Sequence, residues 1–287
     1  MLIADNWIDY ELLDAADGMK LERWKNIILE RPDPQVIWSD RSSPDLWKNA
    51  HAKYNRSQSG GGEWQIISSI PDFWSVEYKP LKFNIKPMGF KHTGLFPEQS
   101  VNWDFIADII KSRSGRTSIL NLFAYTGGAT LASAHAGADV VHVDASKGMV
   151  QWAKENAALS GLGEAKIRYI VDDCVKFVQR EIRRGHKYDA IIMDPPSYGR
   201  GPKGELWKFE DELCDLVNLC RQLLSDSASL FIINSYTSSV SHTIVANVLD
   251  MAVKKSFGGT ITSDEICIPI GKSGMLLPCG AATRWYR

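Results

Sequence analysis

Four stretches of sequence decide the fold: SILNLFAYTGG at residues 118–128, DVVHVD at 139–144, IRYIVDD at 167–173 and DAIIMDPPSY at 189–198. Each contains a short apolar run, which is typical of a buried strand, and ends in polar or small residues. Helix-like segments separate them, and this alternation predicts a parallel sheet covered on both faces. Since parallel sheets bind ligands outside the carboxyl ends of their strands, we expect the four strand ends to form one crevice.

The segments around and after these stretches extend the same pattern. The spacing of apolar residues predicts three helices, over Val150–Leu159, Glu210–Leu224 and Ile244–Val253. Leu230–Ile233 reads as a fifth core strand, and Ile266–Ile270 with Ala281–Trp285 as a terminal antiparallel pair. The fold class that follows is α/β.

Composition sets limits on the function. With 287 residues and 44% hydrophobic content, the chain can hold one large domain with a small appendage and bury a sizeable core. The formal net charge is -1, and the pI is about 6.6. Nonspecific nucleic-acid binding comes from clustered Lys and Arg, so these values argue against a general polyanion binder while leaving room for local basic patches.

Cysteines and apolar runs indicate the cellular setting. None of the five cysteines forms a CxxC pair or lies at metal-ligand spacing from a histidine; they are Cys174, Cys214, Cys220, Cys267 and Cys279. The sequence therefore predicts neither a metal site nor a disulfide framework. No stretch approaches the roughly 20 apolar residues that a membrane-spanning helix needs, and we expect a soluble, cytoplasmic protein.

Residues 1–90 differ from the rest of the chain, with scattered tryptophans and prolines among short apolar runs. This texture predicts a small β-rich N-terminal domain, with the larger domain over residues 91–287. Ser57–Gly62 is expected to be a mobile loop. From Arg41 to Lys91 there are eight basic residues against four acidic ones. This excess predicts either an RNA-facing patch or a solvated β surface with tryptophans in its core.

The residues after the first three strands predict a nucleoside-binding crevice. Small residues up to Gly128 let backbone N–H groups approach a carboxylate or phosphate, although an ordinary tight turn would look the same. Asp144 ends the second strand where an acidic residue accepts hydrogen bonds from ribose hydroxyls; the alternative is a helix N-cap. Of Asp172 and Asp173, we expect one to accept from an adenine amino group and the other to cap a helix.

The fourth strand end separates this crevice from a dinucleotide site. Pro195 and Pro196 fix the backbone and offer no N–H donors, so carbonyl oxygens of a rigid turn after Asp194 can accept from an amino-bearing planar substrate. Tyr198 is available to stack on its ring. A purely structural turn is the alternative. The glycines and basic residues that follow, Arg200 and Lys203 among them, predict a mobile loop beside the acceptor site.

These motifs together resemble the class I S-adenosylmethionine-dependent methyltransferases, and within them the branch of bacterial large-subunit rRNA methyltransferases. The matching stretches are Phe90–Gln99, Asn121–Gly128, Val143–Ser146, Asp172-Asp173 and Asp194–Ser197. The resemblance implies a Rossmann-like methyltransferase sheet with a small N-terminal β-rich domain. It also implies S-adenosyl-L-methionine as the cofactor and RNA, specifically rRNA, as the partner.

The resemblance also implies roles by position. Phe96 and Gln99 would lie over the cofactor. The methionine part would be held by Asn121, Phe123, Ala124, Tyr125, Thr126 and Gly127. The ribose would lie at Asp144, Ala145 and Ser146, and the adenine at Asp172 or Asp173. The acceptor would face the catalytic residues Asp194, Pro195, Pro196 and Tyr198.

The chain departs from the family pattern in two places. Members that make 5-methylcytosine present a nucleophilic cysteine just after the fourth or fifth strand, because that carbon must be activated by covalent addition. Here those strands lead into Pro195–Tyr198 and Asn234–Thr237, which contain no cysteine. We therefore predict methylation at an atom that needs no cysteine adduct. The tryptophan-rich N-terminal segment also replaces the recognisable RNA-binding module of those enzymes.

Four functions are compatible with the sequence. The first is methylation of an RNA base. The second is methylation of a protein or small molecule, which the near-neutral charge favours. The third is a non-catalytic cofactor-binding RNA-binding or assembly factor, and the fourth and most distant is a nicotinamide oxidoreductase. Because the glycine turn and the Asp-Pro-Pro turn are both present, an active methyltransferase is the preferred hypothesis.

Overall fold

The computed structural model describes residues 1–57, 61–200, 206–236, 240–271 and 273–287. The chain divides into two compact units. The first comprises residues 1–2, 101–266 and 280–287, and the second comprises residues 3–100 and 267–279. The C-terminal segment thus contributes to both units, a division that the run of strand and helix patterns along the sequence does not suggest.

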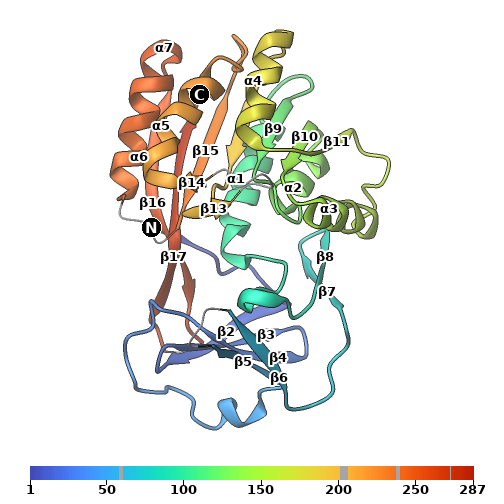
Figure 1. Cartoon of the computed structure of the whole chain (residues 1–287), viewed down its shortest axis with the longest axis vertical. Coiled ribbons are helices and arrows are strands. Elements are labelled where there is room, and N and C mark those ends of the chain that lie inside the picture. The colour runs from blue at the N-terminus through green and yellow to red at the C-terminus, as the bar shows by residue number, and fades with distance from the viewer. Residues whose placement is uncertain (58–60, 201–205, 237–239, 272) are drawn as a thin grey trace. The chain divides into compact units, whose positions relative to one another are not determined.

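The first unit is built on a large, mainly parallel sheet, as expected (Figure 1). Its order is β1 (Leu2–Ile3), β16 (Thr260–Pro269), β17 (Leu276–Tyr286), β15 (Leu230–Ser235), β12 (Ala190–Met193), β9 (Ser118–Leu122), β10 (Asp139–Asp144) and β11 (Ile167–Val171). Neighbours from β11 to β15 pair parallel, whereas β17 pairs antiparallel with β15. Strand order reverses between β9 and β12, which places the switch point of the fold there.

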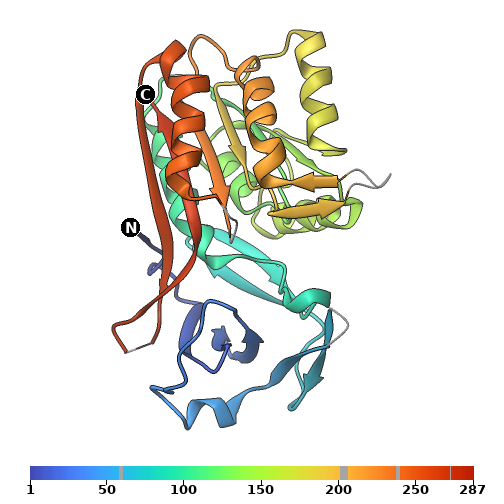
Figure 2. The ribbon, with the colours of Figure 1, turned by 60° about the vertical axis from the view of Figure 1, so that its left-hand side comes forward.

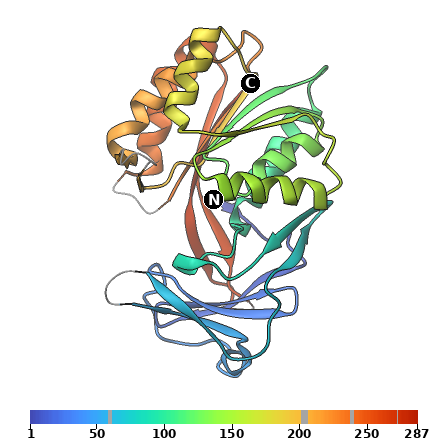
Figure 3. The ribbon, with the colours of Figure 1, turned by 45° about the vertical axis from the view of Figure 1, so that its right-hand side comes forward.

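Helices cover both faces of this sheet (Figure 3). They are α1 (Ser100–Lys111), α2 (Gly128–His135), α3 (Lys147–Leu159), α4 (Cys174–Arg184), α5 (Phe209–Arg221), α6 (His242–Leu249), a π-helical turn (Asp250–Lys254) and α7 (Lys255–Phe257). Alternate residues of the strands face opposite ways. Leu122 and Met193 pack with α4, α5 and α6, whereas Ile119 and Ile192 pack with α1 and α2.

The central strands owe their position to uninterrupted apolar sequence. Every residue of β12 and β15 is buried, because a parallel strand covered on both faces exposes neither set of side chains. The outer strand β16 is half-exposed and polar over its first residues, Thr260–Ser263. Because buried and exposed residues alternate only weakly in this segment, the sequence did not indicate that β16 begins at Thr260, well before the expected start at Ile266.

A short hairpin follows β12 (Figure 2). Its strands β13 (Tyr198–Arg200) and β14 (Leu206–Lys208) pair antiparallel. The expected mobile loop therefore begins and ends in paired backbone, while Lys203 lies outside the described residues.

The second unit carries a five-stranded sheet in the order β2 (Tyr10–Ala16), β3 (Met19–Trp24), β4 (Ile27–Pro32), β5 (Ala52–Arg56) and β6 (Gly62–Ile66). A hairpin of β7 (Trp74–Tyr78) and β8 (Leu81–Ile85) and three 3-10 turns complete it: η1 (Leu46–Asn49), η2 (Gly89–Lys91) and η3 (Pro97–Gln99). Asp17 and Gly18 both have positive φ, 54° and 73°, as a tight two-residue hairpin turn requires. Of the expected loop Ser57–Gly62, residues 58–60 lie outside the described chain.

Tryptophans hold the second unit together. Trp24 and Trp47 are buried, and the indole N–H groups of Trp38 and Trp64 donate to the backbone carbonyls of Ala15 and Met88 at 2.5 and 2.7 Å. These contacts match the alternative in which the aromatic side chains form the core of a β surface. Within the described residues, no helix is long and apolar enough to cross a membrane.

Candidate functional site

The strand register aligns the carboxyl ends of the central strands. Leu122 of β9 pairs with Val143 of β10 on one side and with Met193 of β12 on the other. Met193 in turn pairs with Ile233 of β15. The residue that follows each member of this row therefore lies at one edge of the sheet, on either side of the switch point. The sequence placed Asp144 and Asp194 there, and the register brings both to that edge.

The loop after β9 adopts an unusual backbone. Phe123 and Tyr125 have positive φ, 53° and 49°, and Gly127 follows at 94°. Non-glycine residues rarely adopt this conformation, so strong local contacts must hold it. A Cβ on Gly127 would meet the Cβ of Ala153 at 3.0 Å, so glycine is required here for close packing against α3 as well as for its backbone angle.

The backbone N–H groups of this loop are bound within the protein. Phe123 N donates to the Cys174 sulfur at 3.3 Å, and Ala124 N donates to the carbonyl of Val143 at 3.0 Å. Tyr125 N donates to Asp144 Oδ2 at 2.9 Å. The loop is thus fixed against β10 and α4, which leaves the half-buried side chains of Phe123 and Tyr125 at its surface.

A buried polar network supports the loop from below. Asn121 donates to the hydroxyl of Thr130 at 2.8 Å, and that hydroxyl lies 2.9 Å from Nδ1 of His142. Burial lowers the pKa of His142 to about 3, so its ring is neutral and shares a hydrogen bond with the Thr130 hydroxyl. Asn156 donates to the carbonyl of Thr126 at 2.9 Å. Asn121 therefore faces helix α2, where it orders the start of the loop.

Asp144 ends β10 at the strand-end edge, next to the loop after β9. Its Oδ1 accepts from Ser146 N at 2.8 Å, and its Oδ2 accepts from Tyr125 N. The N-cap of α3 is Ser146, so Asp144 is not the cap. Burial raises the pKa of Asp144, although the two N–H donors act in the opposite direction. Each carboxylate oxygen keeps a lone pair with which to accept a hydroxyl.

Asp172 and Asp173 divide their tasks. Asp173 caps α4 by accepting from Lys176 N at 2.9 Å. Asp172 accepts from the N–H of Asp173 at 2.9 Å and forms an ion pair with Arg180. Its own N–H donates to the carbonyl of Asp144 at 3.0 Å, which joins the ends of β10 and β11. The cap therefore falls to Asp173, and the side chain of Asp172 is oriented by Arg180.

The turn after β12 is held by two aromatic residues that sequence reasoning missed. Tyr236 donates its hydroxyl to Asp194 Oδ2 at 3.1 Å. The indole of Trp207 donates to the carbonyl of Pro196 at 2.7 Å, and its ring lies 5.3 Å from that of Phe123. Trp207 thus connects the turn to the loop after β9. Pro195 is buried, whereas Tyr198 is 54% exposed, free to meet a planar ligand.

Comparison with known proteins identifies the family. The model for the S-adenosylmethionine-dependent methyltransferases matches residues 48–238, about two thirds of the chain. The chain belongs to this family. A SAM-dependent methyltransferase from Agrobacterium tumefaciens has 36% identity and a TM-score of 0.94, over 99% of this chain and 92% of that one. The protein SMU.776, solved with SAH, matches the fold at a TM-score of 0.71, with 19% identity, 97% coverage of this chain and 76% of that one.

Curated relatives of the chain are named as ribosomal RNA methyltransferases. "Ribosomal RNA large subunit methyltransferase K/L" of Shewanella frigidimarina is 26% identical over 276 residues. The match covers 93% of this chain but only 36% of that relative, so the methyltransferase spans about a third of the length of the relative.

The strand ends fit the cofactor of this family, S-adenosylmethionine. The methyltransferase presents a glycine turn in which a Cβ at Gly127 would crowd Ala153 and Leu131, and a partly buried carboxylate, Asp144, with accepting capacity left. Both features lie at the switch point, where a nucleoside is expected to bind. Phe96 and Gln99 lie in the second unit, at the start and within η3, and their role over the cofactor stays a prediction.

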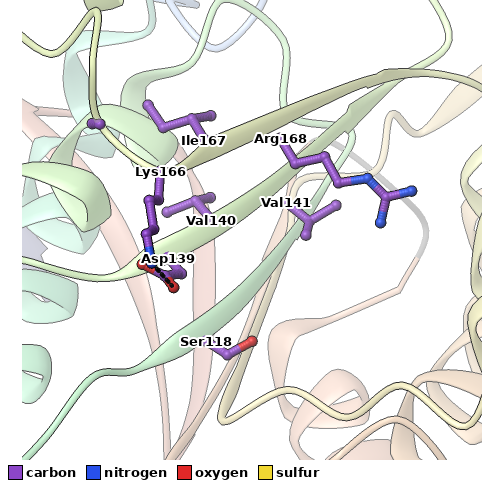
Figure 4. Close-up of a pocket in the computed structure, with 8 residues that line it drawn as sticks. Ser118, Asp139, Val140, Val141, Lys166, Ile167 and Arg168 are labelled. Atoms are coloured by element: carbon purple, nitrogen blue, oxygen red, sulfur yellow. Dashed lines mark ion pairs between the residues drawn. The ribbon is translucent and has the colours of Figure 1, made fainter.

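Other features of the methyltransferase lie away from these strand ends. A hollow at the amino edge of the sheet is lined by the first residues of β9, β10 and β11 (Ser118, Asp139 and Ile167), with Lys166 paired to Asp139 (Figure 4). It therefore lies opposite the candidate site. Within the described chain, no group of three or more His, Cys, Asp or Glu is arranged to hold a metal ion.

Proposed function

We propose that this enzyme transfers the methyl group of S-adenosylmethionine to a base of RNA, specifically of large-subunit ribosomal RNA in the cytoplasm. The observation that carries the proposal is the Asp194-Pro195-Pro196 turn, held rigid by Tyr236 and Trp207 beside the loop after β9. The Shewanella relative, which is named as a ribosomal RNA large subunit methyltransferase, supports the RNA substrate.

Each strand end then has a task. Asp144 accepts hydrogen bonds from the ribose hydroxyls of the cofactor. The loop from Phe123 to Gly127 encloses its methionine part, and Asp172 lies on its adenine side. The cofactor supplies an electrophilic sulfonium methyl, so the chain needs only to position an acceptor in line with it. Asp194 accepts a hydrogen bond from the acceptor base, and Tyr198 stacks on its ring. Positioning therefore accounts for most of the rate enhancement.

No cysteine in the structure is suited to a covalent base adduct. Cys174 is buried, and burial raises the pKa of its thiol well above its ordinary value. The thiolate is the nucleophilic form, so this sulfur is inert and serves instead as the acceptor for Phe123 N. Cys214 is exposed on helix α5, and the expected turn after β15 holds Tyr236 in place of a cysteine. The methylated atom is accordingly one with its own lone pair.

The sharpest test starts from tritiated S-adenosylmethionine. The purified enzyme is incubated with total RNA and, separately, with protein lysate, both from a strain that lacks the gene. We expect label in the RNA fraction, and much less of it with Asp144→Ala at the same sub-saturating cofactor concentration. Label confined to the protein lysate would replace this proposal with protein methylation, which the net charge of -1 favours. Label in neither fraction, with measurable cofactor binding, would also refute it.

Cysteine chemistry has its own test. Cys174→Ser and Cys214→Ser should leave methyl transfer within about threefold of wild type, because neither sulfur attacks the base. RNA containing 5-fluorocytidine should form no covalent complex that survives denaturing electrophoresis. Loss of transfer in either variant with cofactor binding intact, or a stable adduct, would contradict the adduct-free mechanism.

A further inference from the structure

A second buried polar network, formed by Arg284, Asn102 and Asn234, reaches the strand-end edge at β15. Arg284 of β17 donates from Nε to Asn102 Oδ1 at 2.8 Å, and from Nη2 to the carbonyl of Val101 at 3.1 Å. Asn102 of α1 donates from Nδ2 to Asn234 Oδ1 at 2.8 Å. All three side chains are buried, at 6%, 2% and 4% exposure. Residues from α1, β15 and β17 thus form one chain of hydrogen bonds.

The chemistry of arginine sets the direction of every bond in this chain. A guanidinium has donors only, so the atom of Asn102 that faces it must be the oxygen. The amide nitrogen of Asn102 then faces Asn234, whose partner atom must be its own oxygen. The orientation of both amides therefore follows from the position of one cation, and the nitrogen of Asn234 points away from the network.

Arg284 is held firmly enough to impose that order. Its guanidinium stacks on the ring of Phe105, with Cζ of Arg284 4.5 Å from the ring centroid. Burial lowers the pKa of Arg284 to about 10, so it remains charged at neutral pH. Burying a cation costs free energy, which the hydrogen bonds of Arg284 to Asn102 and Val101 and the charge of Asp264 offset in part.

The amide nitrogen of Asn234 lies at the acceptor side of the candidate site. Asn234 directly follows Ile233, which pairs with Met193, the residue before Asp194. Asn234 contacts Asn102 of α1, and Asp194 comes one position after β12, the strand next to β15. No partner for Asn234 Nδ2 occurs within the part of the chain that the structure describes. A carboxylate and an amide donor thus directly follow two paired residues at the ends of adjacent strands.

We propose that Asn234 donates to the methyl acceptor beside Asp194, and that Asn102 and Arg284 are positioning residues for it; this inference rests on the proposed RNA-base methylation. Asp194 accepts from an N–H of the base while Asn234 donates to the adjacent oxygen or ring nitrogen. Nucleobase edges carry such a donor next to an acceptor, whereas a phosphate carries acceptors alone. The pair therefore selects a base over the RNA backbone.

An isosteric substitution distant from the acceptor tests this orientation. In Asn102→Asp, the carboxylate still pairs with Arg284, but it now repels Asn234 Oδ1. The Asn234 amide must turn over, so its oxygen enters the site in place of the donors. Asn102→Asp and Asn234→Ala should each lower methyl transfer to total RNA from the deletion strain about 10- to 100-fold. The double variant should be no slower than Asn234→Ala alone.

Cofactor affinity and stability separate this role from a structural one. Both single variants should bind S-adenosylmethionine within about twofold of wild type by calorimetry, and Asn102→Asp should keep the wild-type Tm because the new carboxylate still accepts from Arg284. Asn218→Asp, on the exposed face of α5, adds the same charge away from the network and should transfer at the wild-type rate. The inference is overturned if the single variants transfer normally, lose cofactor affinity in parallel with transfer, or combine additively. Failure of wild type to label any RNA would instead refute the proposed function, and this inference with it.

Discussion

The hydroxyl of Tyr236 donates to Asp194 Oδ2 at 3.1 Å, across 42 positions of sequence. Asp194 follows β12 and Tyr236 follows β15, so the bond joins the ends of two adjacent strands. A donor to a carboxylate stabilises its charged form and fixes the direction of its remaining lone pairs. Asp194 is therefore oriented before any acceptor binds.

Removing this orientation should slow transfer and leave cofactor binding unchanged. Asp194→Ala deletes the acceptor contact itself, and Tyr236→Phe deletes only the hydroxyl that orients it. A hydrogen bond to a charged group contributes about 1.5–3 kcal/mol, so Tyr236→Phe should lower the single-turnover rate about 10- to 100-fold at most. Asp194→Ala should be slower still. Equal loss of cofactor affinity in either variant, measured by calorimetry, would place Asp194 on the cofactor side instead.

Asp144 should show the converse behaviour. Asp144→Ala removes the carboxylate that accepts from Tyr125 N and, as proposed, from the ribose, so the Kd for S-adenosylmethionine should rise about 10- to 100-fold. Transfer at saturating cofactor should fall much less. Asp139→Ala is a matched control, because Asp139 begins the strand that Asp144 ends and pairs with Arg116 at 3.0 Å. Unchanged affinity in Asp144→Ala would exclude the ribose assignment.

The pH dependence of cofactor affinity follows from the same carboxylate. Burial raises the pKa of Asp144, so it takes up a proton at a higher pH than an exposed aspartate. Affinity should therefore fall as the pH falls through this raised pKa, since a protonated carboxyl accepts more weakly. Asp144→Asn should bind weakly at every pH tested and remove the dependence.

Gly127 and Gly137 separate backbone strain from crowding. Both have positive φ, 94° and 102°, so alanine at either position incurs a similar strain of about 1 kcal/mol. Only at Gly127 would the new Cβ meet neighbours, Ala153 and Leu131 at 3.0 and 3.1 Å, whereas at Gly137 nothing lies within 4 Å. Gly127→Ala should lose about 1–3 kcal/mol more stability in urea than Gly137→Ala. It alone should weaken cofactor binding; equal effects of the two substitutions would show that crowding is unimportant.

The strands of the sheet could be predicted because a short apolar run in the sequence marks each of them. Apolar runs such as Leu230–Ile233 are buried on both faces, and the acids that follow the strands come to one edge by register alone. The ends of elements were less predictable. The apolar run that starts at Ser118 continues to Phe123, but β9 ends at Leu122 because Phe123 turns to a φ of 53° to enter the loop.

The remaining parts of the site depend on contacts between distant segments. Asn102 is 132 positions from Asn234 and 182 positions from Arg284. No local periodicity of the sequence pairs residues at such separations. Likewise, the backbone bridge between Leu12 and Ile270 joins the segment 267–279 to residues 3–100 within the second unit. Only the folded chain brings such residues together.

Glu98 should make stability depend on pH near neutrality. It is 7% exposed in η3, and burial raises its pKa to about 7, with Lys20 and Arg31 acting in the opposite direction. The folded state thus binds this proton more tightly than the unfolded chain, whose glutamate titrates near 4.5. The contribution of Glu98 is fully present below pH 4.5 and is lost as the pH rises through about 7.

Glu98→Gln isolates this contribution from groups with the opposite sign. His92, whose pKa burial lowers to about 4, stabilises the fold at higher pH, so the total for wild type mixes both effects. The difference in unfolding free energy between wild type and Glu98→Gln removes His92 from the comparison. Between pH 4.5 and pH 8, the unfolding free energy of wild type should fall by up to about 3 kcal/mol relative to that of Glu98→Gln. Glu63→Gln, exposed on β6, serves as the control, and a flat line for Glu98→Gln would mean that Glu98 is ionised in the folded protein throughout.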